Sequence, residues 1–415
     1  MFGRAFGDIR GLGVHRSIGL QVTFGSSVMM IMGASLVYPV LPVIVQSLAV
    51  PEAQIGLVFT AFTLPAVFLA PVTGALTDLR GRRLVLVSGL LTYGVAGLAI
   101  ALVDTLPALL ALRVVQGVGY GAVMPLVTVL IGDAFPDARQ QTTAQGVKVV
   151  LDRVTLLVLP AAAGVLGAIA WQWPFVLYGV AIPMALAAVR WLPEPAMEPR
   201  SHAPSYLREV ARAAVRVRSL VIFSMSSLRF FIEVSFFIYV PLYALNVLDV
   251  PVVRGGLLFS VFAVGSIATA GAVGPLAARF ARMPLVAGAF VAQAAALLGA
   301  SVAPNVWVLG LAMLVFGLAN GVISPVQKSL LTQAVPAELR GGYVSADRFA
   351  QNGAKSIAPL VAGLVVALAG IPVMFQAMAG VAGAWALGVI VLERLGLLRS
   401  DAAAVAAPLP GPFAD

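Results

Sequence analysis

Ionisable and amide side chains recur at helical spacing inside strongly apolar stretches of this sequence. Residues four apart lie on one face of a helix, so each set presents its polar groups together. If these stretches cross a membrane, a charge near the bilayer centre costs about 3 kcal/mol or more, and the polar faces must be turned toward protein or water. Such groups can bind a charged cargo or carry a proton. The sets are Lys148 and Asp152, Arg229 and Glu233, and the stripe Asp347, Arg348, Gln351, Asn352 and Lys355.

Glu233 is the first candidate for a group that carries a proton. Burial favours its protonated form, whereas Arg229, one helical turn away, favours the carboxylate. A conformational change that separates the two groups could therefore load or release a proton. A static ion pair that neutralises two buried charges is the alternative. Asp152 and Arg113 complete the predicted proton-coupling set.

The charges within the apolar stretches also predict the kind of cargo. Cations outnumber acids by six to three, which favours an anionic or zwitterionic compound. The cations are Arg113, Lys148, Arg153, Arg229, Arg348 and Lys355, and the acids are Asp152, Glu233 and Asp347. Methionine and aromatic side chains suit a tolerant pocket, although core packing is the alternative for each of them. The predicted substrate site comprises Lys355, Asp347, Gln351, Asn352, Arg153, Met29, Met32, Phe236 and Tyr239.

The composition identifies the elements that must position these residues. Of the 415 residues, 60% are hydrophobic and only 10% are charged, whereas a soluble domain carries about 25% charged residues. The sequence therefore predicts an all-α integral membrane protein. With no cysteine and two histidines, we expect no cofactor, no metal site and no enzymatic triad. The net charge of +9 is attributed to membrane topology rather than to nucleic-acid binding.

Twelve apolar segments are long enough to span a bilayer. Basic residues gather in alternate connections, and by the positive-inside rule we expect both termini in the cytoplasm and the protein in the cytoplasmic (inner) membrane. Arg208, Arg212 and Arg216 predict a basic amphipathic helix on the inner leaflet. The predicted spans are 17–48, 53–77, 84–103, 107–132, 142–168, 173–192, 219–247, 254–278, 283–303, 306–333, 342–368 and 372–395.

The two halves of the chain repeat at an offset of 200 residues. Residues 56–60 read Gly-Leu-Val-Phe-Thr, and residues 256–260 read Gly-Leu-Leu-Phe-Ser. Glycines and prolines continue the match, and Pro160 and Pro359 extend it at an offset of 199. We therefore expect two six-helix bundles of the same topology, with the binding site between them. The predicted domains are 1–192, a linker at 193–218, 219–399 and a cytoplasmic tail at 400–415.

Two motifs resemble those of the major facilitator superfamily. Residues 74–83 read G-A-L-T-D-L-R-G-R-R, similar to the signature loop G-x-L-x-D-x-x-G-R-R, and residues 113–119 read R-V-V-Q-G-V-G, similar to R-x-x-Q-G-x-G. The resemblance implies a monomer that works by alternating access. It also implies a conformational latch on the cytoplasmic side, for which a simple positive-inside anchor is the alternative. The latch residues are Gly74, Asp78, Gly81, Arg82 and Arg83.

The fifth span bears on the subfamily. Residues 159–164 read L-P-A-A-A-G and keep the proline and last glycine of the G-P-x-x-G-G motif of drug-proton antiporters, whereas Leu159 and Ala163 replace glycines. We therefore expect proton-coupled efflux of a small amphipathic compound, with protons and membrane lipids as further partners. An organic-anion importer or a lysolipid flippase is the alternative, and a non-transporting receptor or scaffold is an alternative of another class.

Overall fold

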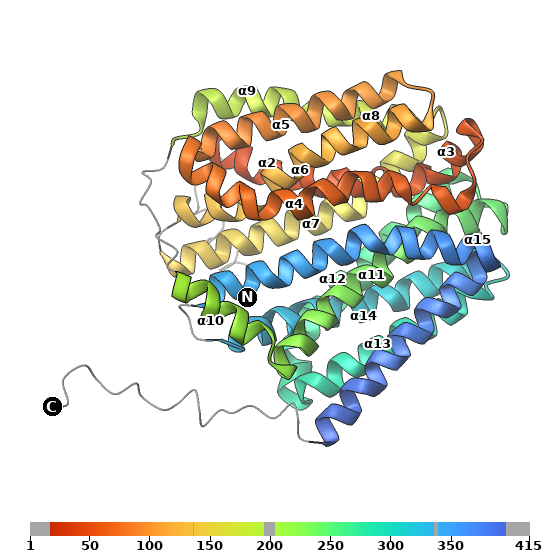
Figure 1. Ribbon diagram of the computed structural model, residues 1–415. Coiled ribbons are helices and arrows are strands. Elements are labelled where there is room, and N and C mark those ends of the chain that lie inside the picture. The colour runs from red at the N-terminus through yellow and green to blue at the C-terminus, as the bar shows by residue number, and fades with distance from the viewer. Residues whose placement is uncertain (1–16, 136, 195–203, 336–338, 396–415) are drawn as a thin grey trace.

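The computed structural model describes residues 17–135, 137–194, 204–335 and 339–395, and these contain helices and no strands. Figure 1 shows the N-terminal helices (red to yellow) packed together in its upper half and the C-terminal helices (green to blue) in its lower half. The N-terminal bundle comprises α2 (Ile18–Ser35), α3 (Leu41–Leu48), α4 (Leu57–Arg80), α5 (Arg82–Ala99), α6 (Leu106–Ala134), α7 (Ala138–Gly167), α8 (Trp173–Val176) and α9 (Ala181–Trp191). Short 3-10 turns at Tyr38–Val40, Glu52–Gln54, Ile100–Leu102 and Leu177–Val180 join or extend these helices.

The C-terminal bundle comprises α11 (Val217–Asn246), α12 (Val252–Arg279), α13 (Arg282–Ser301), α14 (Val306–Gln333) and α15 (Arg340–Arg394). Eleven segments of the described chain are long and apolar enough to cross a membrane, against twelve in the prediction. The last of them, Gly342–Arg394, is 53 residues long. The backbone leaves helical geometry at Gly370, with φ 84°, where glycine has no Cβ to clash. Division at Gly370 separates the two predicted spans.

Contacts between the bundles repeat with the sequence. A Cβ added to Gly56 would lie 2.9 Å from the carbonyl oxygen of Pro359, and one added to Gly256 would lie 2.5 Å from that of Pro160. The hydroxyl of Thr60 donates to the Ser356 carbonyl at 3.0 Å, and that of Ser260 donates to the Leu157 carbonyl at 2.6 Å. Each of these contacts therefore has a counterpart in the other half, and the two related bundles meet through α4, α7, α12 and α15.

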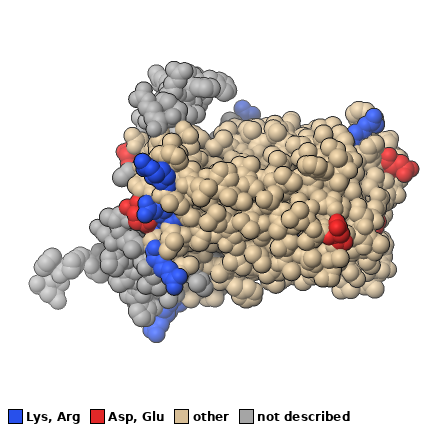
Figure 2. Space-filling model, turned by 90° about the horizontal axis from the view of Figure 1, so that it is seen from above, with Lys and Arg blue, Asp and Glu red and all other residues tan. Residues whose placement is uncertain are grey.

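On the visible surface, most of the charged side chains gather toward the ends of the molecule. Figure 2 shows a broad belt that is mostly uncharged, with most of the visible lysines and arginines at the end where α10 lies in Figure 1. Arg80, Arg83, Arg212 and Arg216 are exposed. The predicted basic segment forms the helix α10 (Pro204–Ala214), and the Ser219 hydroxyl holds its end by donating to the Ala213 carbonyl at 2.7 Å. Its contact with lipid stays a prediction.

Candidate functional site

Glu233 lies in a three-residue network on facing helices of the C-terminal bundle. The guanidinium of Arg229 on α11 donates to Glu233 Oε2 at 3.1 Å, which forms the predicted ion pair. Asn320 on α14 donates its amide N–H to the same oxygen at 2.5 Å and accepts from Arg229 Nη1 at 3.4 Å. Sequence reasoning missed Asn320, whose polar amide in the middle of an apolar span was the available signal.

Asp347 lies in a second network and is 1% exposed. Its Oδ1 is hydrogen-bonded to the Ser226 hydroxyl of α11. Its Oδ2 accepts from the amide of Gln327 on α14 at 3.0 Å and from that of Gln351 on α15 at 2.6 Å. Asp347 and Gln351 therefore contact each other as their spacing predicted, whereas Ser226 and Gln327 are partners that only the tertiary structure supplies.

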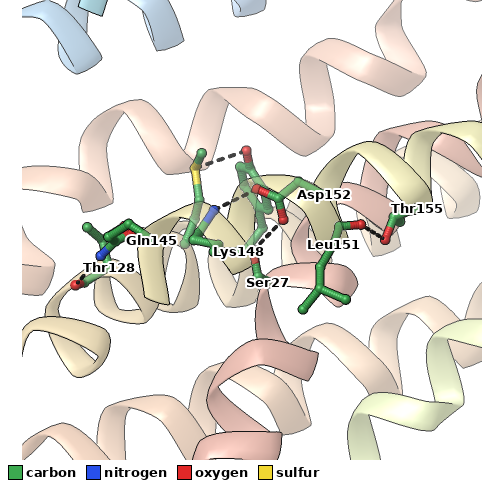
Figure 3. A network of polar contacts seen from close by, with 9 residues as sticks. Ser27, Thr128, Gln145, Lys148, Leu151, Asp152 and Thr155 are labelled. Atoms are coloured by element: carbon green, nitrogen blue, oxygen red, sulfur yellow. Dashed lines mark hydrogen bonds and ion pairs between the residues drawn. The ribbon is translucent and has the colours of Figure 1, made fainter. Parts of the chain in front are cut away.

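Asp152 is held within the N-terminal bundle. It accepts from Lys148 at 2.7 Å, one turn earlier on α7, and from the hydroxyl of Ser27 on α2 at 2.5 Å. Figure 3 shows Asp152 between these two donors. The amide of Gln145, one turn before Lys148, donates to the Thr128 carbonyl of α6 at 3.3 Å. This face of α7 is thus tied to both α2 and α6.

Three of the six cations predicted within the apolar stretches make no hydrogen bond or ion pair with a residue that the structure describes. They are Arg153, Arg348 and Lys355, hereafter the cationic triad. The ammonium of Lys355 lies 3.9 Å from the centre of the Phe230 ring, and the Arg229 guanidinium lies 3.8 Å from the same ring. An aromatic ring can hold a cation in place without neutralising it.

Electrostatic interactions link the triad across the two bundles. Lys328 of α14 interacts with Arg153 of α7 and with Arg348 of α15. Arg153 also interacts with Arg229, and Arg348 interacts with Lys355. Arg348 and Lys328 are exposed, whereas Arg153 and Lys355 are half-buried. Cations of both halves therefore lie within electrostatic range of one another, together with the acids Glu233 and Asp347, and the excess of cations favours a bound anion.

Arg113 lies apart from the predicted proton groups. It is 1% exposed and donates to the Gly33 carbonyl at 3.2 Å and to Gln116 Oε1 at 2.8 Å. The rings of Phe62, Phe175 and Tyr178 surround its guanidinium at 5.4, 5.0 and 5.7 Å. These contacts all belong to the N-terminal bundle and join α2, α4 and α6.

The predicted apolar lining is distributed over separate places. Met29 and Met32 of α2 are 6% and 3% exposed, and their carbonyls accept from tyrosine hydroxyls inside the N-terminal bundle. Phe236 is fully buried and packs against Phe316 and Phe375 within the C-terminal bundle. Tyr239 lies near the contact between bundles, because a Cβ on Gly363 would meet both the Ala53 carbonyl oxygen of the N-terminal bundle and, at 3.3 Å, the Tyr239 hydroxyl. Asn352 is half-buried, and its carbonyl accepts from Ser356 at 3.0 Å.

The signature loop is held by two acids that sequence reasoning did not single out. Arg82 forms an ion pair with Asp133 at the end of α6. The backbone N–H groups of Arg82 and Arg83 donate to the carboxylate of Glu194 at 2.5 and 3.2 Å, which caps the start of α5. Gly81 precedes them with φ 87°, a conformation that favours glycine. Gly74 and Asp78 belong to α4, but their side chains lie outside the described residues.

Replacing Glu194 with alanine (Glu194→Ala) is expected to destabilise the protein by about 1 kcal/mol, the usual cost of losing a helix N-cap. The carboxylate satisfies backbone donors that have no partner within the helix. Thermal unfolding in detergent measures the effect. Glu209→Ala, which removes an exposed acid on α10, serves as the control, and equal unfolding temperatures for the two variants would contradict the capping role.

A cavity of about 360 Å³ lies elsewhere, between the start of α2, the end of α6 and the segment Leu192–Pro193. Asp133 is its one acidic lining residue and is occupied by Arg82. None of the cationic triad lines this cavity. It therefore does not correspond to the predicted substrate site.

The chain matches a known family model, and parts of it are similar in sequence to known transporters. The model of the Major Facilitator Superfamily matches residues 23–354 and 252–408. The Multidrug transporter protein MdtP of Bacillus subtilis (strain 168) is 31% identical over 131 residues, which are 31% of this chain and 24% of that protein. The Quinolone resistance protein NorA of Staphylococcus aureus (strain MRSA252) is 30% identical over 148 residues, 36% of this chain and 38% of that protein. The matches thus span well under half of either relative.

A crystal structure of the nucleoside transporter NupG has a TM-score of 0.76 at 15% identity, over 91% of this chain and 100% of that one. The likeness extends over nearly the whole described chain. At this identity it concerns the fold alone.

Proposed function

The chain belongs to the Major Facilitator Superfamily, and we propose that it exports small amphipathic compounds that carry an acidic group, either anionic or zwitterionic. The site lies between the two bundles and is opened to each side in turn. Protons move in the opposite direction. Export is supported by the similarity to two relatives, a multidrug transporter and a quinolone resistance protein. As a member of this family the protein is a transporter rather than an enzyme.

The cationic triad carries the proposal about cargo. Asp152 is already bound by Lys148 and Ser27, and Glu233 by Arg229 and Asn320. Asp347 is held by three neutral side chains, and no acid of the described chain forms an ion pair with the triad. A carboxylate on the cargo would supply the missing negative charge, and Arg348 and Lys355 lie on one helix face to receive it. The apolar body of the compound would lie against the surrounding aromatic side chains.

Glu233 is proposed as the coupling proton site. Its ion pair with Arg229 joins two groups of one helix, and Asn320 adds a contact to α14. Protonation of Glu233 removes the negative charge that Arg229 now balances. A positively charged group of a zwitterionic cargo would compete with the proton for this carboxylate. Proton and cargo would then bind in alternation, as exchange of one for the other requires.

Membrane placement follows the distribution of charge. We propose insertion in the cytoplasmic membrane with both termini on the cytoplasmic side, which is supported by the exposed arginines at the α10 end. Helix α10 would lie on anionic lipids of that leaflet. A monomer is sufficient for this mechanism, because both halves of the site belong to one chain.

The test of this function is proton flux in liposomes that contain the purified protein and an internal pH dye. Anionic, zwitterionic and cationic amphiphiles are added in turn. Anionic or zwitterionic compounds are expected to evoke flux in the wild type. Glu233→Gln is expected to lower that flux by at least about tenfold, since coupling requires a titratable group. Asp104→Asn, which neutralises an exposed acid in a loop, is the control and is expected to retain flux.

The other results of the assay have definite meanings. Flux evoked by cations alone would contradict the role of the triad. Protons that enter together with the anion would identify an importer instead of an exporter. A response to lysolipids alone would identify a flippase. Binding of cargo without any transport would favour the receptor.

A further inference from the structure

Asp347 differs from the other two buried acids in the kind of partner it has. Asp152 and Glu233 each contact a cation, at 2.7 and 3.1 Å. Asp347 contacts three neutral groups, and no cation of the described chain forms an ion pair with it. It is also the most enclosed of the three, with 1% of its surface exposed. An ionised carboxylate without a counter-ion is unfavourable in such a place.

The hydrogens available in this network point to its protonation state. The Ser226 hydroxyl has one hydrogen, but its oxygen lies at hydrogen-bond distance from two groups, the Phe223 carbonyl at 3.0 Å and Asp347 Oδ1. If Asp347 is ionised, both neighbours are acceptors and one contact has no hydrogen. If Asp347 carries a proton on Oδ1, its O–H donates to Ser226, and Ser226 donates to Phe223.

The remaining contacts fit the same arrangement. The amides of Gln327 and Gln351 both donate to Oδ2, which is the carbonyl oxygen of an acid protonated on Oδ1. Every contact around Asp347 is then a complete hydrogen bond. A fully connected network of this kind is favoured in the interior, where an unmade hydrogen bond is costly.

We propose that Asp347 holds a proton in this conformation and is a second proton-binding group of the transporter. Other charged or titratable groups lie within electrostatic range of Asp347, but none of those in the described chain forms an ion pair with it. Arg229 of α11 is paired with Glu233. Lys355 lies on the Phe230 ring. On α15, Arg348 is exposed, and the Tyr343 hydroxyl is buried. From α14 the contact is the neutral amide of Gln327.

This proton changes the charge that the cargo meets. Arg348 follows Asp347 directly and Lys355 lies two helical turns further along α15, so loss of the proton adds a negative charge beside two members of the triad. That consequence rests on the proposed function, whereas the protonation itself does not. Loss of the proton would weaken the binding of an anionic group at the triad, so Asp347 sets the charge of the cargo site, whereas proton exchange is assigned to Glu233.

The experiment is infrared difference spectroscopy of the purified full chain in lipid, titrated from acidic to alkaline pH without cargo. A protonated carboxylic acid gives a carbonyl-stretch band that a carboxylate lacks. The wild type is expected to show this band at neutral pH and to lose it at alkaline pH. Asp347→Asn is expected to abolish it, because asparagine has no carboxyl group. Its amide still offers a donor to Ser226 and an accepting oxygen to Gln327 and Gln351, so the network is preserved. Asp152→Asn is the matched control and is expected to keep the band.

Several results would overturn the proposal. These are the absence of the band in the wild type at neutral pH, or a band of unchanged intensity in Asp347→Asn. Ser226→Ala gives an independent measurement on a chain that retains the acid. Its band is expected to shift in frequency, since the proton loses its acceptor, and an unshifted band would contradict the assigned contact. The spectra are recorded without cargo, so they do not depend on the proposed function. If the flux assay showed no transport, the band of Asp347 would still be expected.

Discussion

Lys355→Gln is expected to reduce transport of an anionic amphiphile by roughly ten- to hundredfold, the equivalent of a lost charge-assisted hydrogen bond of about 1.5–3 kcal/mol. The ammonium lies 3.9 Å from the centre of the Phe230 ring and forms no ion pair with an acid of the described chain, so its charge is available to the cargo. Glutamine keeps much of the length of the side chain and a hydrogen-bond donor. The measurement is the initial rate of transport of a labelled carboxylate into liposomes of known protein content.

Two further variants separate the charge from the fold. Lys355→Arg retains the charge and is expected to keep much of the rate. Arg254→Gln removes an exposed cation near the α3 end and is expected to have no effect. If Lys355→Gln slowed a neutral amphiphile as strongly as an anionic one, the lysine would serve the conformational cycle and not the cargo.

Gly256→Ala is expected to disfavour the conformation in which the bundles meet at the start of α12, at the end of the molecule opposite α10. Transport is expected to fall in a protein that still folds. The added Cβ would lie 2.5 Å from the Pro160 carbonyl oxygen and 3.3 Å from the Ala161 Cα atom, both backbone atoms that cannot turn aside. Overpacking of this kind costs about 1–3 kcal/mol, which shifts a two-state population by roughly five- to 150-fold. We therefore expect a conformation in which the bundles separate here to gain population.

The chain offers a close control for this prediction. An added Cβ on Gly255, the neighbouring residue, would meet nothing within 4 Å, so Gly255→Ala is expected to transport normally. Since the sequence contains no cysteine, spin labels on Ser47→Cys and Val302→Cys can report the separation of the bundles. A longer label distance in Gly256→Ala than in Gly255→Ala is expected. Equal distance distributions would show that this contact does not limit the closed state.

The sequence alone was sufficient to predict the membrane-spanning segments, the division into two related halves, and the types of residue in the candidate site. Span positions depend on local apolar length, and the repeat needs only a comparison of the chain with itself. The count differed at α15 alone, because one residue, Gly370, changes the direction of the backbone without interrupting the apolar run. Pairs four residues apart were equally accessible, and Arg229–Glu233 and Lys148–Asp152 are ion pairs as their spacing predicted.

The partners from other helices came from the tertiary structure. Most of these partners are distant in sequence: Asn320 is 87 residues from Glu233, Ser27 is 125 from Asp152, and Ser226 is 121 from Asp347. Gln327 is 20 residues from Asp347 and lies on another helix. Which of them meet depends on how each helix is rotated about its axis and crosses its neighbours. Phe236 illustrates the same limit, because its aromatic character suits a pocket but the rotation of α11 buries it between Phe316 and Phe375.

The amino-acid sequence by itself therefore determined the membrane class, the two related bundles and the presence of buried charge, since each follows from patterns within one helix or from one half repeating the other. Only the tertiary structure decided which charges are neutralised and which stay available. That difference depends on contacts between helices. If a helix turns about its axis by the angle between successive residues, a side chain exchanges a hydrogen-bonding neighbour for an apolar one. The cationic triad and the neutral partners of Asp347 are consequences of that packing.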